Sequence, residues 1–172
     1  MKNTLLLLMT LCSFLALSSC QKSGINLFAG DYSYKTTGTV TVQRQPTLAN
    51  PQVSASFDIE LLPELGQLQI ATLDRKEDSV IVVINQLNGD ILVTHGRCED
   101  DEITLCKFQR DALTLSVEGN NDLKFPVTIN GTGHIYDGNT IIFDLEYKGK
   151  AQLGDLTYNL KGTNIKMVAY RN

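Results

Sequence analysis

The chain has 172 residues and a formal net charge of −4 at pH 7, with 19 Asp and Glu residues against 15 Lys and Arg residues. This mildly acidic balance, without any run of basic residues, argues against nucleic acid as a partner, because phosphate binding needs a basic stripe. The chain has no Trp and only two His residues, which limits metal and acid–base chemistry.

The first twenty residues have the pattern of an export signal. Lys2 precedes an apolar run from Leu5 to Leu17, which is shorter than the roughly 20 residues that a membrane-spanning helix needs. The run ends in Leu17-Ser18-Ser19-Cys20, which resembles the lipobox of bacterial lipoproteins. The resemblance implies cleavage before Cys20 and acylation of its thiol, which anchors the chain in a membrane. The alternative is an ordinary signal peptide that contains a cysteine.

These features predict a signal peptide over residues 1–19, a lipidated tether over residues 20–27 and one domain over residues 28–172. That domain is long enough to bury a sizeable core. In lipoproteins of this kind, a residue other than Asp after the cysteine implies the outer membrane, and here that residue is Gln21. We therefore expect a cell-envelope protein whose membrane partner is reached through the N-terminal lipid, on either face.

Short segments of alternating apolar and polar residues, separated by turn signals, follow one another through the domain. They cover residues 30–43, 53–59, 68–72, 80–87, 90–96, 103–108, 112–118, 127–135, 141–147, 156–160 and 165–169. The segment 80–87 is apolar on both faces, which predicts either a strand covered on both sides or an interior of mixed depth. No segment of the domain shows a helical apolar period. The pattern predicts an all-β fold of about eight to ten short strands, either a barrel or a sandwich.

The clearest hairpin lies between residues 127 and 147. Two alternating runs flank Asp137-Gly138, which predicts a type I′ turn, and Asn88-Gly89 carries the same signal. In the first of these runs, Gly131 and Gly133 share a face, which indicates a strand that bends or is closely approached by a neighbour.

Two cysteines remain in the domain once Cys12 leaves with the signal and Cys20 carries the lipid. Cys98 and Cys106 flank the acidic residues 99–102, which read as an exposed hairpin tip, so we favour a disulfide in the oxidising envelope. The alternative is a pair of buried free thiols.

The start of the first strand carries a family resemblance. Phe28-Ala29-Gly30-Asp31-Tyr32 looks like the opening of calycin barrels, which include the lipocalins, although Tyr32 stands where that superfamily has Trp. In calycins an Arg near the end of the last strand packs over this ring, and Arg171 is the candidate here. The span 28–172 is similar to calycin-like lipoproteins of Gram-negative bacteria, most of which have no assigned activity. The resemblance implies a single antiparallel meander barrel closed by Tyr32 and Arg171.

The sequence offers no convincing catalytic or metal site. His134 lies on a polar strand face, which is typical of a solvated exterior. His95 is in phase with Ile91 and Val93, which predicts that it faces the core or a cavity. Two histidines on separate strands do not make a zinc site, and the acidic residues 99–102 are better read as a solvated turn than as a calcium loop. No Ser or Cys nucleophile motif is present. We therefore expect no enzyme activity, no metal and no cofactor.

The expected function is the binding of a small apolar or amphipathic ligand inside the barrel, because a barrel of about eight strands can hold one small ligand. The candidate lining residues are Phe57, Ile70, Val93, His95, Phe143 and Tyr147. A barrel of this size can also be filled by its own side chains. In that case we expect a structural or protein-binding lipoprotein whose envelope partner contacts the acidic tip and the loop over residues 44–52.

Overall fold

A computed structural model of the chain describes residues 24–46, 54–73, 78–118 and 121–172. The predicted signal peptide, Cys20, residues 47–52 of the predicted loop and Val53 of the next predicted strand lie outside the described residues. Within the described part of the chain, no helix has the length and apolar character needed to cross a membrane.

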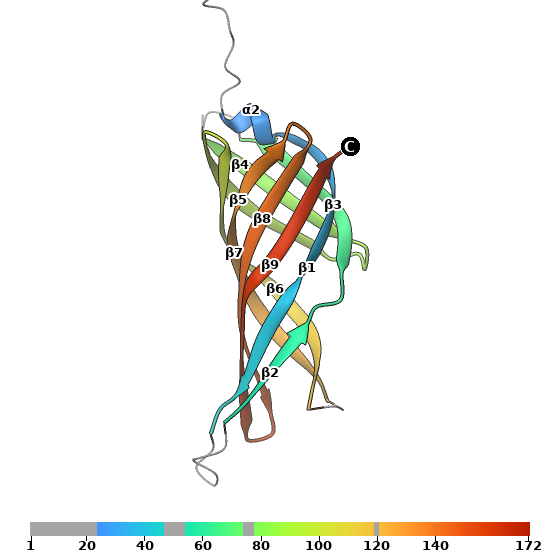
Figure 1. The fold of residues 1–172 in the computed structure, drawn as a ribbon, viewed down its shortest axis with the longest axis vertical. Helices are drawn as coiled ribbons and strands as arrows, with labels where there is room; N and C mark the ends of the chain where they lie inside the picture. Colours follow the sequence, from blue (N-terminus) through green and yellow to red (C-terminus); the bar gives the residue numbers. More distant parts are fainter. Residues whose placement is uncertain (1–23, 47–53, 74–77, 119–120) are drawn as a thin grey trace, which may run out of the picture.

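Nine antiparallel strands form one sheet that closes on itself into a barrel (Figure 1). The strand order is β2-β1-β3-β4-β5-β6-β7-β8-β9, and an additional pairing between β1 and β9 closes the sheet. This confirms the prediction of a single all-β antiparallel meander barrel. The elements are α2 (Gly24–Phe28), β1 (Gly30–Arg44), β2 (Ala55–Glu60), β3 (Glu64–Thr72), β4 (Ser79–Gln86), β5 (Ile91–Glu99), β6 (Glu102–Val117), β7 (Asn121–Asp137), β8 (Thr140–Leu153) and β9 (Leu156–Arg171).

The barrel has a closed part and an open part, because β2 and β3 share one side of β1. The first half of β1 pairs with β3, from Gly30↔Ile70 to Thr36↔Glu64, and the second half pairs with β2. In the β3 half, β4 and β5 bridge to β6 and complete a ring. In the β2 half the pairing of β5 with β6 has already ended, so β2 and the second part of β6 face each other without a strand between them in the described chain.

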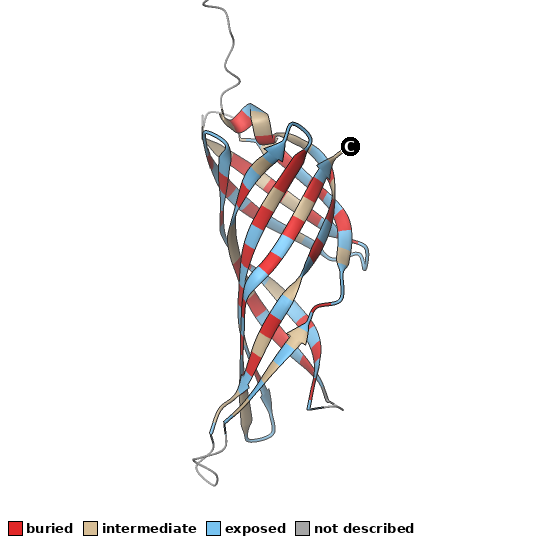
Figure 2. Ribbon diagram, viewed as in Figure 1, coloured by how far each residue is buried: buried red, intermediate tan, exposed pale blue. Residues whose placement is uncertain are grey.

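Large side chains occupy the interior of the closed ring. Alternate residues of the strands other than β2 are buried, as the banding in Figure 2 shows. The largest fully buried side chains include Tyr32, Leu68, Ile70, Ile103, Phe143, Ile165 and Met167, and Phe28 of α2 is fully buried with them. The ring therefore has a packed core, which is the filled interior that the sequence left open.

The N-terminal end of the domain differs from the predicted tether. Residues 24–28 form the short helix α2, in which Ile25 and Phe28 are buried in the core cluster. The Ala29 amide donates to the Ile25 carbonyl at 3.1 Å, which closes the helical turn. The structured domain thus begins by Gly24, because two apolar side chains gain burial by packing on the end of the barrel.

Two pairs of predicted strands are each one long strand in the structure. Residues 103–108 and 112–117 belong to one strand, β6, whose pairing with β7 shifts register between Leu105 and Phe108 and again between Arg110 and Leu113. Such bulges keep a long strand paired while it coils around a barrel. Residues 156–160 and 165–169 are likewise parts of a single strand, β9.

The hairpin between β7 and β8 is confirmed, but its turn is not type I′. Asp137 pairs with Thr140, so Gly138 and Asn139 are the central residues. None of these residues has a positive φ, which a type I′ turn requires. The Asn139 amide instead donates to Asp137 Oδ1 at 2.9 Å, an interaction that stabilises this turn through a side chain.

The turn between β4 and β5 is also wider than predicted. The Gly89 amide donates to the Gln86 carbonyl at 3.0 Å, and the Gln86 amide donates to the Asp90 carbonyl at 2.9 Å. Of the residues in this turn, only Gly89 has a positive φ (92°). Leu87, Asn88 and Gly89 therefore form a three-residue loop of the kind that ends in a left-handed glycine.

The close approach predicted at the β7 glycines is confirmed at Gly133. A Cβ atom there would lie 2.5 Å from Phe143 Cδ1 and 2.9 Å from Ile103 Cγ2. The glycine therefore makes room for the Phe143 ring inside the barrel.

The predicted facing of β4 and β5 is wrong in part. In β4, Val80, Val82 and Ile84 are buried, whereas Ile81 and Val83 are only half-buried, so one face lies outward. In β5 the inward residues are Thr94, Gly96 and Cys98, and the predicted inward set is exposed: Ile91 (64%), Val93 (52%) and His95. The pairing of Cys98 with Ile103 sets this phase, and the inward Thr94 hydroxyl is satisfied because it donates to the Cys106 carbonyl at 3.0 Å.

The predicted disulfide is wrong, because Cys98 and Cys106 are both free thiols. Cys98 lies opposite Ile103 and faces the core, whereas Cys106 is exposed on the outer face. Residues on opposite faces of a hairpin direct their Cβ atoms apart, which is incompatible with disulfide geometry. The acidic residues 99–102 do form the exposed tip of that hairpin.

Candidate functional site

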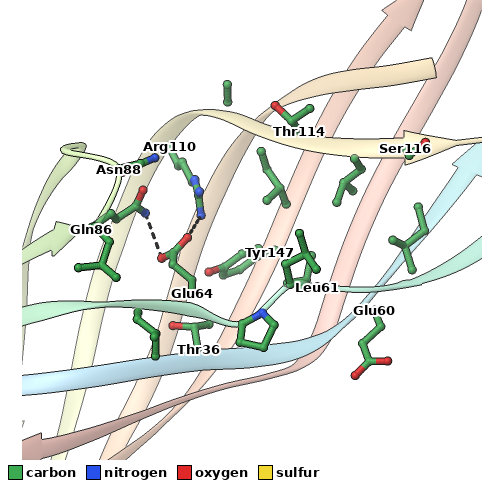
Figure 3. Close-up of a pocket in the computed structure, with 18 residues that line it drawn as sticks. Thr36, Glu60, Leu61, Glu64, Gln86, Asn88, Arg110, Thr114, Ser116 and Tyr147 are labelled. Atoms are coloured by element: carbon green, nitrogen blue, oxygen red, sulfur yellow. Dashed lines mark hydrogen bonds and ion pairs between the residues drawn. The ribbon is translucent and has the colours of Figure 1, made fainter. Parts of the chain in front are cut away.

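A pocket of about 710 Å³ opens in the side of the barrel, where β2 ends and β3 begins (Figure 3). Its walls come from the β2–β3 link and from the second part of β6, with the β4–β5 turn at one side. Thr36 of β1 and Tyr147 of β8 complete it. The lining residues are Thr36, Ile59 to Leu65, Gln86 to Asn88, Arg110, Ala112 to Ser116 and Tyr147.

Three local features of the sequence create this opening. Pro63 has no amide hydrogen to donate to a neighbouring strand, and the chain between β2 and β3 is unpaired at residues 62–63. The β4–β5 hairpin turns back at residues 87–89, level with Leu65, whose carbonyl accepts from the Leu87 amide at 3.2 Å. Because β6 continues past this level, its edge and the β2–β3 link are left as the two walls.

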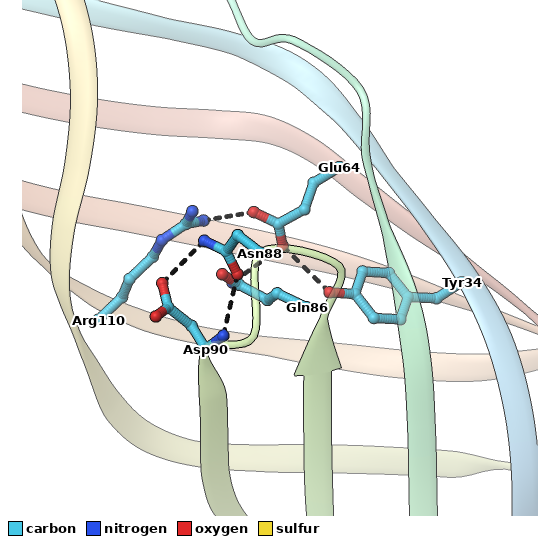
Figure 4. A network of polar contacts seen from close by, with 6 residues as sticks. All are labelled: Tyr34, Glu64, Gln86, Asn88, Asp90 and Arg110. Carbon is cyan, nitrogen blue, oxygen red and sulfur yellow. Dashed lines mark hydrogen bonds and ion pairs between the residues drawn. The ribbon is translucent and has the colours of Figure 1, made fainter.

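Glu64 is the centre of a polar cluster at the pocket (Figure 4). Its Oε2 atom lies 2.6 Å from Arg110 Nη1, and its Oε1 atom accepts from Gln86 Nε2 at 3.1 Å and from the Tyr34 hydroxyl at 3.2 Å. The Glu64 and Arg110 side chains are 24% and 13% exposed, so this ion pair is partly shielded from solvent. Charge-assisted hydrogen bonds of this kind fix both side chains.

Two tyrosines beside this cluster hold their protons firmly. Burial, followed by the negative charge of Glu64, raises the pKa of Tyr34 and that of Tyr147 well above the ordinary value, and Arg110 opposes the shift in both cases. Both phenols are therefore neutral at physiological pH and can act as hydrogen-bond donors.

The cluster also contains unused hydrogen-bonding capacity. Gln86 Oε1 and Arg110 Nε are buried and have no partner among the described residues. The first is an acceptor and the second is a donor. Buried polar atoms without partners cost free energy, so a molecule that satisfies them gains affinity.

The rest of the pocket is apolar. Leu61, Leu113 and Leu115 are buried in its walls. At the mouth, Leu62 is 90% exposed, Leu87 is 77% exposed and Leu65 is 48% exposed. The arrangement combines an apolar wall and rim with one polar cluster, which is the composition typical of small-molecule sites.

Of the predicted lining residues, only Tyr147 lies in this pocket. Ile70 and Phe143 are part of the filled ring, and Phe57 is partly buried against the core. Val93 lines a smaller pocket of about 350 Å³ between residues 90–93 and 109–112. His95 is exposed on the outer face, opposite Ile81, as is His134, opposite Ile142.

The polar residues of the pocket, Glu64, Gln86 and Arg110, are absent from the sequence prediction. One of them, Gln86, could have been found from the pattern of its strand. Gln86 continues the inward series Val80, Val82 and Ile84, and a polar residue in phase with a buried face needs a partner.

The predicted barrel-closing residues come together at the α2 end of the barrel. The Arg171 guanidinium carbon lies 5.0 Å from the centre of the Tyr32 ring, and Nη2 donates to the Tyr32 hydroxyl at 2.6 Å. Arg171 also donates to the Leu27 carbonyl at 2.6 Å and to the Ala29 carbonyl at 3.0 Å. The Tyr32 hydroxyl donates in turn to the Phe28 carbonyl at 2.7 Å. These contacts join the last strand to α2 and β1.

Among the described residues there is no group of three or more His, Cys, Asp and Glu side chains arranged to hold a metal ion. The acidic tip over residues 99–102 is no exception.

No family model and no curated protein matches the chain. Among solved structures, a redesigned β-barrel (b11L5F_LGL) is 12% identical with a TM-score of 0.44, over 90% of this chain and 99% of that one. A mutant of Transferrin Binding Protein B from Haemophilus parasuis is 10% identical with a TM-score of 0.34, over 84% of this chain and 27% of that one. Ail, the attachment invasion locus protein of Yersinia pestis, is 12% identical with a TM-score of 0.33, over 84% of this chain and all of that one. Likenesses of this size carry no conclusion about function.

Proposed function

We propose that the protein is a non-enzymatic binding protein that holds a small amphipathic molecule in the pocket between the β2–β3 link and β6. The observation that carries this proposal is the pocket itself, because its volume of about 710 Å³ lies within the range of small-molecule sites. The Leu61, Leu113 and Leu115 side chains receive the apolar part of the ligand, and the cluster around Glu64 receives its polar part. The ligand enters from the side and not through the ring, whose interior is packed.

The proposal of a binding role without catalysis is supported by the state of Glu64 in the pocket. Glu64 accepts from three donors, so its carboxylate is already engaged. General-base catalysis needs a group that is free to take a proton from a substrate.

We further propose that the protein works in the cell envelope as a lipoprotein. The support is the lipobox-like sequence ending at Cys20, which places the acylated residue only a few positions before α2. We also propose that the barrel is of the calycin type; the contact of Arg171 with Tyr32 supports this proposal, because the resemblance implies such a contact. The outer membrane is the expected location.

Native mass spectrometry tests the binding function. Residues 21–172, which leave out the acylated Cys20, are exported in the natural host behind a signal peptide without a lipobox, purified without detergent, and weighed under native and denaturing conditions. We expect an excess mass in the native spectrum that is lost on denaturation, and a Leu113→Trp variant, whose larger side chain fills the pocket, should lose it. A native mass equal to the denatured mass, even after exposure to a lipid extract, would contradict the proposal.

The exposed acidic tip favours a second candidate function, the binding of an envelope protein. All four residues from Glu99 to Glu102 are exposed at the end of the β5–β6 hairpin. If this tip is the contact, reversing its four charges abolishes the capture of a partner from envelope extracts. Unchanged capture would exclude the tip.

A further inference from the structure

The fixed charges of the pocket indicate which head group it takes. Glu60, Glu64 and Arg110 are the charged residues in its lining. The only cation among them, Arg110, is already paired with Glu64 at 2.6 Å. Tyr34 and Tyr147 add no charge, since both phenols remain protonated. The described lining therefore offers no uncompensated positive charge to an anion.

A carboxylate head group meets an unfavourable field here. Any position close to the Arg110 guanidinium is also close to the Glu64 carboxylate, so attraction and repulsion largely cancel. The carboxylate then loses its hydration without gaining a counter-ion, which opposes binding. For an ammonium head group, attraction to Glu64 is likewise offset by repulsion from Arg110. Glu60 does not change this balance at the cluster, because it is exposed and lies away from Glu64 and Arg110 (Figure 3).

A head group that is uncharged and can both donate and accept fits the unused capacity of the cluster. Gln86 Oε1 accepts and Arg110 Nε donates, and neither has a partner among the described residues. Gln86 Oε1 is buried, so the Gln86 amide turns about its terminal torsion to meet the ligand and exchanges its hydrogen bond with Glu64 for one with the head group. That torsion is soft, because sp³–sp² rotations have broad minima.

We propose that the pocket selects uncharged amphiphiles whose head group is an amide or a hydroxyl, in preference to fatty acids and to long-chain amines. This inference rests on the proposed function and adds the chemical class of the ligand to it. The selectivity comes from the Glu64–Arg110 pair, which removes the net charge from the polar end of the site.

Three probes with the same tail test the selectivity. Dodecanamide, laurate and dodecylamine are titrated by calorimetry at pH 7.5, below their critical micelle concentrations, into the purified protein freed of bound lipid. We expect dodecanamide to bind at least about tenfold more tightly than either charged probe, a difference equal to about 1.4 kcal/mol. Laurate or dodecylamine binding as tightly as dodecanamide would overturn the inference and leave the proposed function intact. Failure of all three probes to bind would overturn both.

A charge-neutralising variant tests the role of the Glu64–Arg110 pair separately from the binding of the tail. Glu64→Gln keeps the size of the side chain and an oxygen acceptor for Tyr34, but it releases the charge of Arg110. Laurate should then bind at least about tenfold more tightly than it binds the wild type, since an unpaired guanidinium favours a carboxylate. The control Asp144→Asn breaks the exposed ion pair with Lys166 (2.9 Å) and should change neither the laurate affinity nor the dodecanamide affinity. Equal laurate affinity in wild type and Glu64→Gln, with both proteins folded by circular dichroism, would contradict the role of the pair.

Discussion

The closure of the barrel at its α2 end predicts a large stability loss in an Arg171→Ala variant. Arg171 donates three hydrogen bonds, to the Leu27 carbonyl, the Ala29 carbonyl and the Tyr32 hydroxyl. At a net contribution of about 1 kcal/mol each, these hydrogen bonds account for about 3 kcal/mol. The stacking of the guanidinium on the Tyr32 ring adds roughly 0.5–1 kcal/mol. The expected loss of about 3–4 kcal/mol is a large part of the roughly 5–15 kcal/mol that stabilises a typical domain.

Urea unfolding followed by circular dichroism measures this loss, because the chain has no Trp for fluorescence. A thermal melt should show a midpoint lower by roughly 10 °C. The matched control is Lys166→Ala, which also removes a cation from β9, in this case from an exposed ion pair with Asp144. That control should cost less than about 1 kcal/mol. If Arg171→Ala costs no more than the control, the Arg171 side chain does not stabilise the α2 end of the barrel, and the role given to it here is wrong.

Three further predictions concern a glycine and the two thiols. Gly133→Ala should lower the free energy of unfolding by about 1–3 kcal/mol through overpacking. In the control Gly138→Ala, the added Cβ meets nothing within 4 Å, so the free energy of unfolding should change by no more than about 0.5 kcal/mol. Equal melting temperatures of the two variants would contradict this prediction. Iodoacetamide at pH 8 should label Cys106 in the folded protein and Cys98 only after unfolding, as peptide mass mapping will show; early labelling of Cys98 would refute its burial. Burial raises the pKa of Cys98 to about 11 from 9.0, so its contribution to stability is complete below pH 9 and is lost as the pH rises through 11. The stability gap between wild type and Cys98→Ala should therefore narrow over that range, and a constant gap would count against the shift.

Alternation of apolar and polar residues was enough to predict most strands and the fold class. It failed in β5, where Ile91 and Val93 lie outward and Thr94 lies inward. The phase of that strand is set by its pairing with β6, which hydrophobicity alone does not reveal. The continuity of β6 was missed for a related reason, because its two bulges interrupt the alternation without interrupting the pairing.

The candidate site was much harder to predict than the fold. Glu64 and Arg110 are 46 positions apart in the sequence, and they meet only because the β4–β5 hairpin is too short to separate β3 from the far part of β6. Hairpin length relative to neighbouring strands depends on the register of the whole barrel. The inward Gln86 was the one local sign that a polar partner lay inside. By contrast, the contact of Tyr32 with Arg171 was predicted from a family resemblance, because that resemblance states which two residues lie together.

The most direct test of the proposed site is photoaffinity mapping with a dodecyl amide that carries a diazirine at the end of its tail. After irradiation with the purified protein, the modified residues are located by peptide mass spectrometry, with excess dodecanamide as the competitor. We predict competed labelling in residues 59–65 and 112–116, the two apolar walls of the pocket. Competed labelling of the ring interior at Ile70 and Phe143 would show that the ligand lies within the barrel, which would contradict binding in the side pocket.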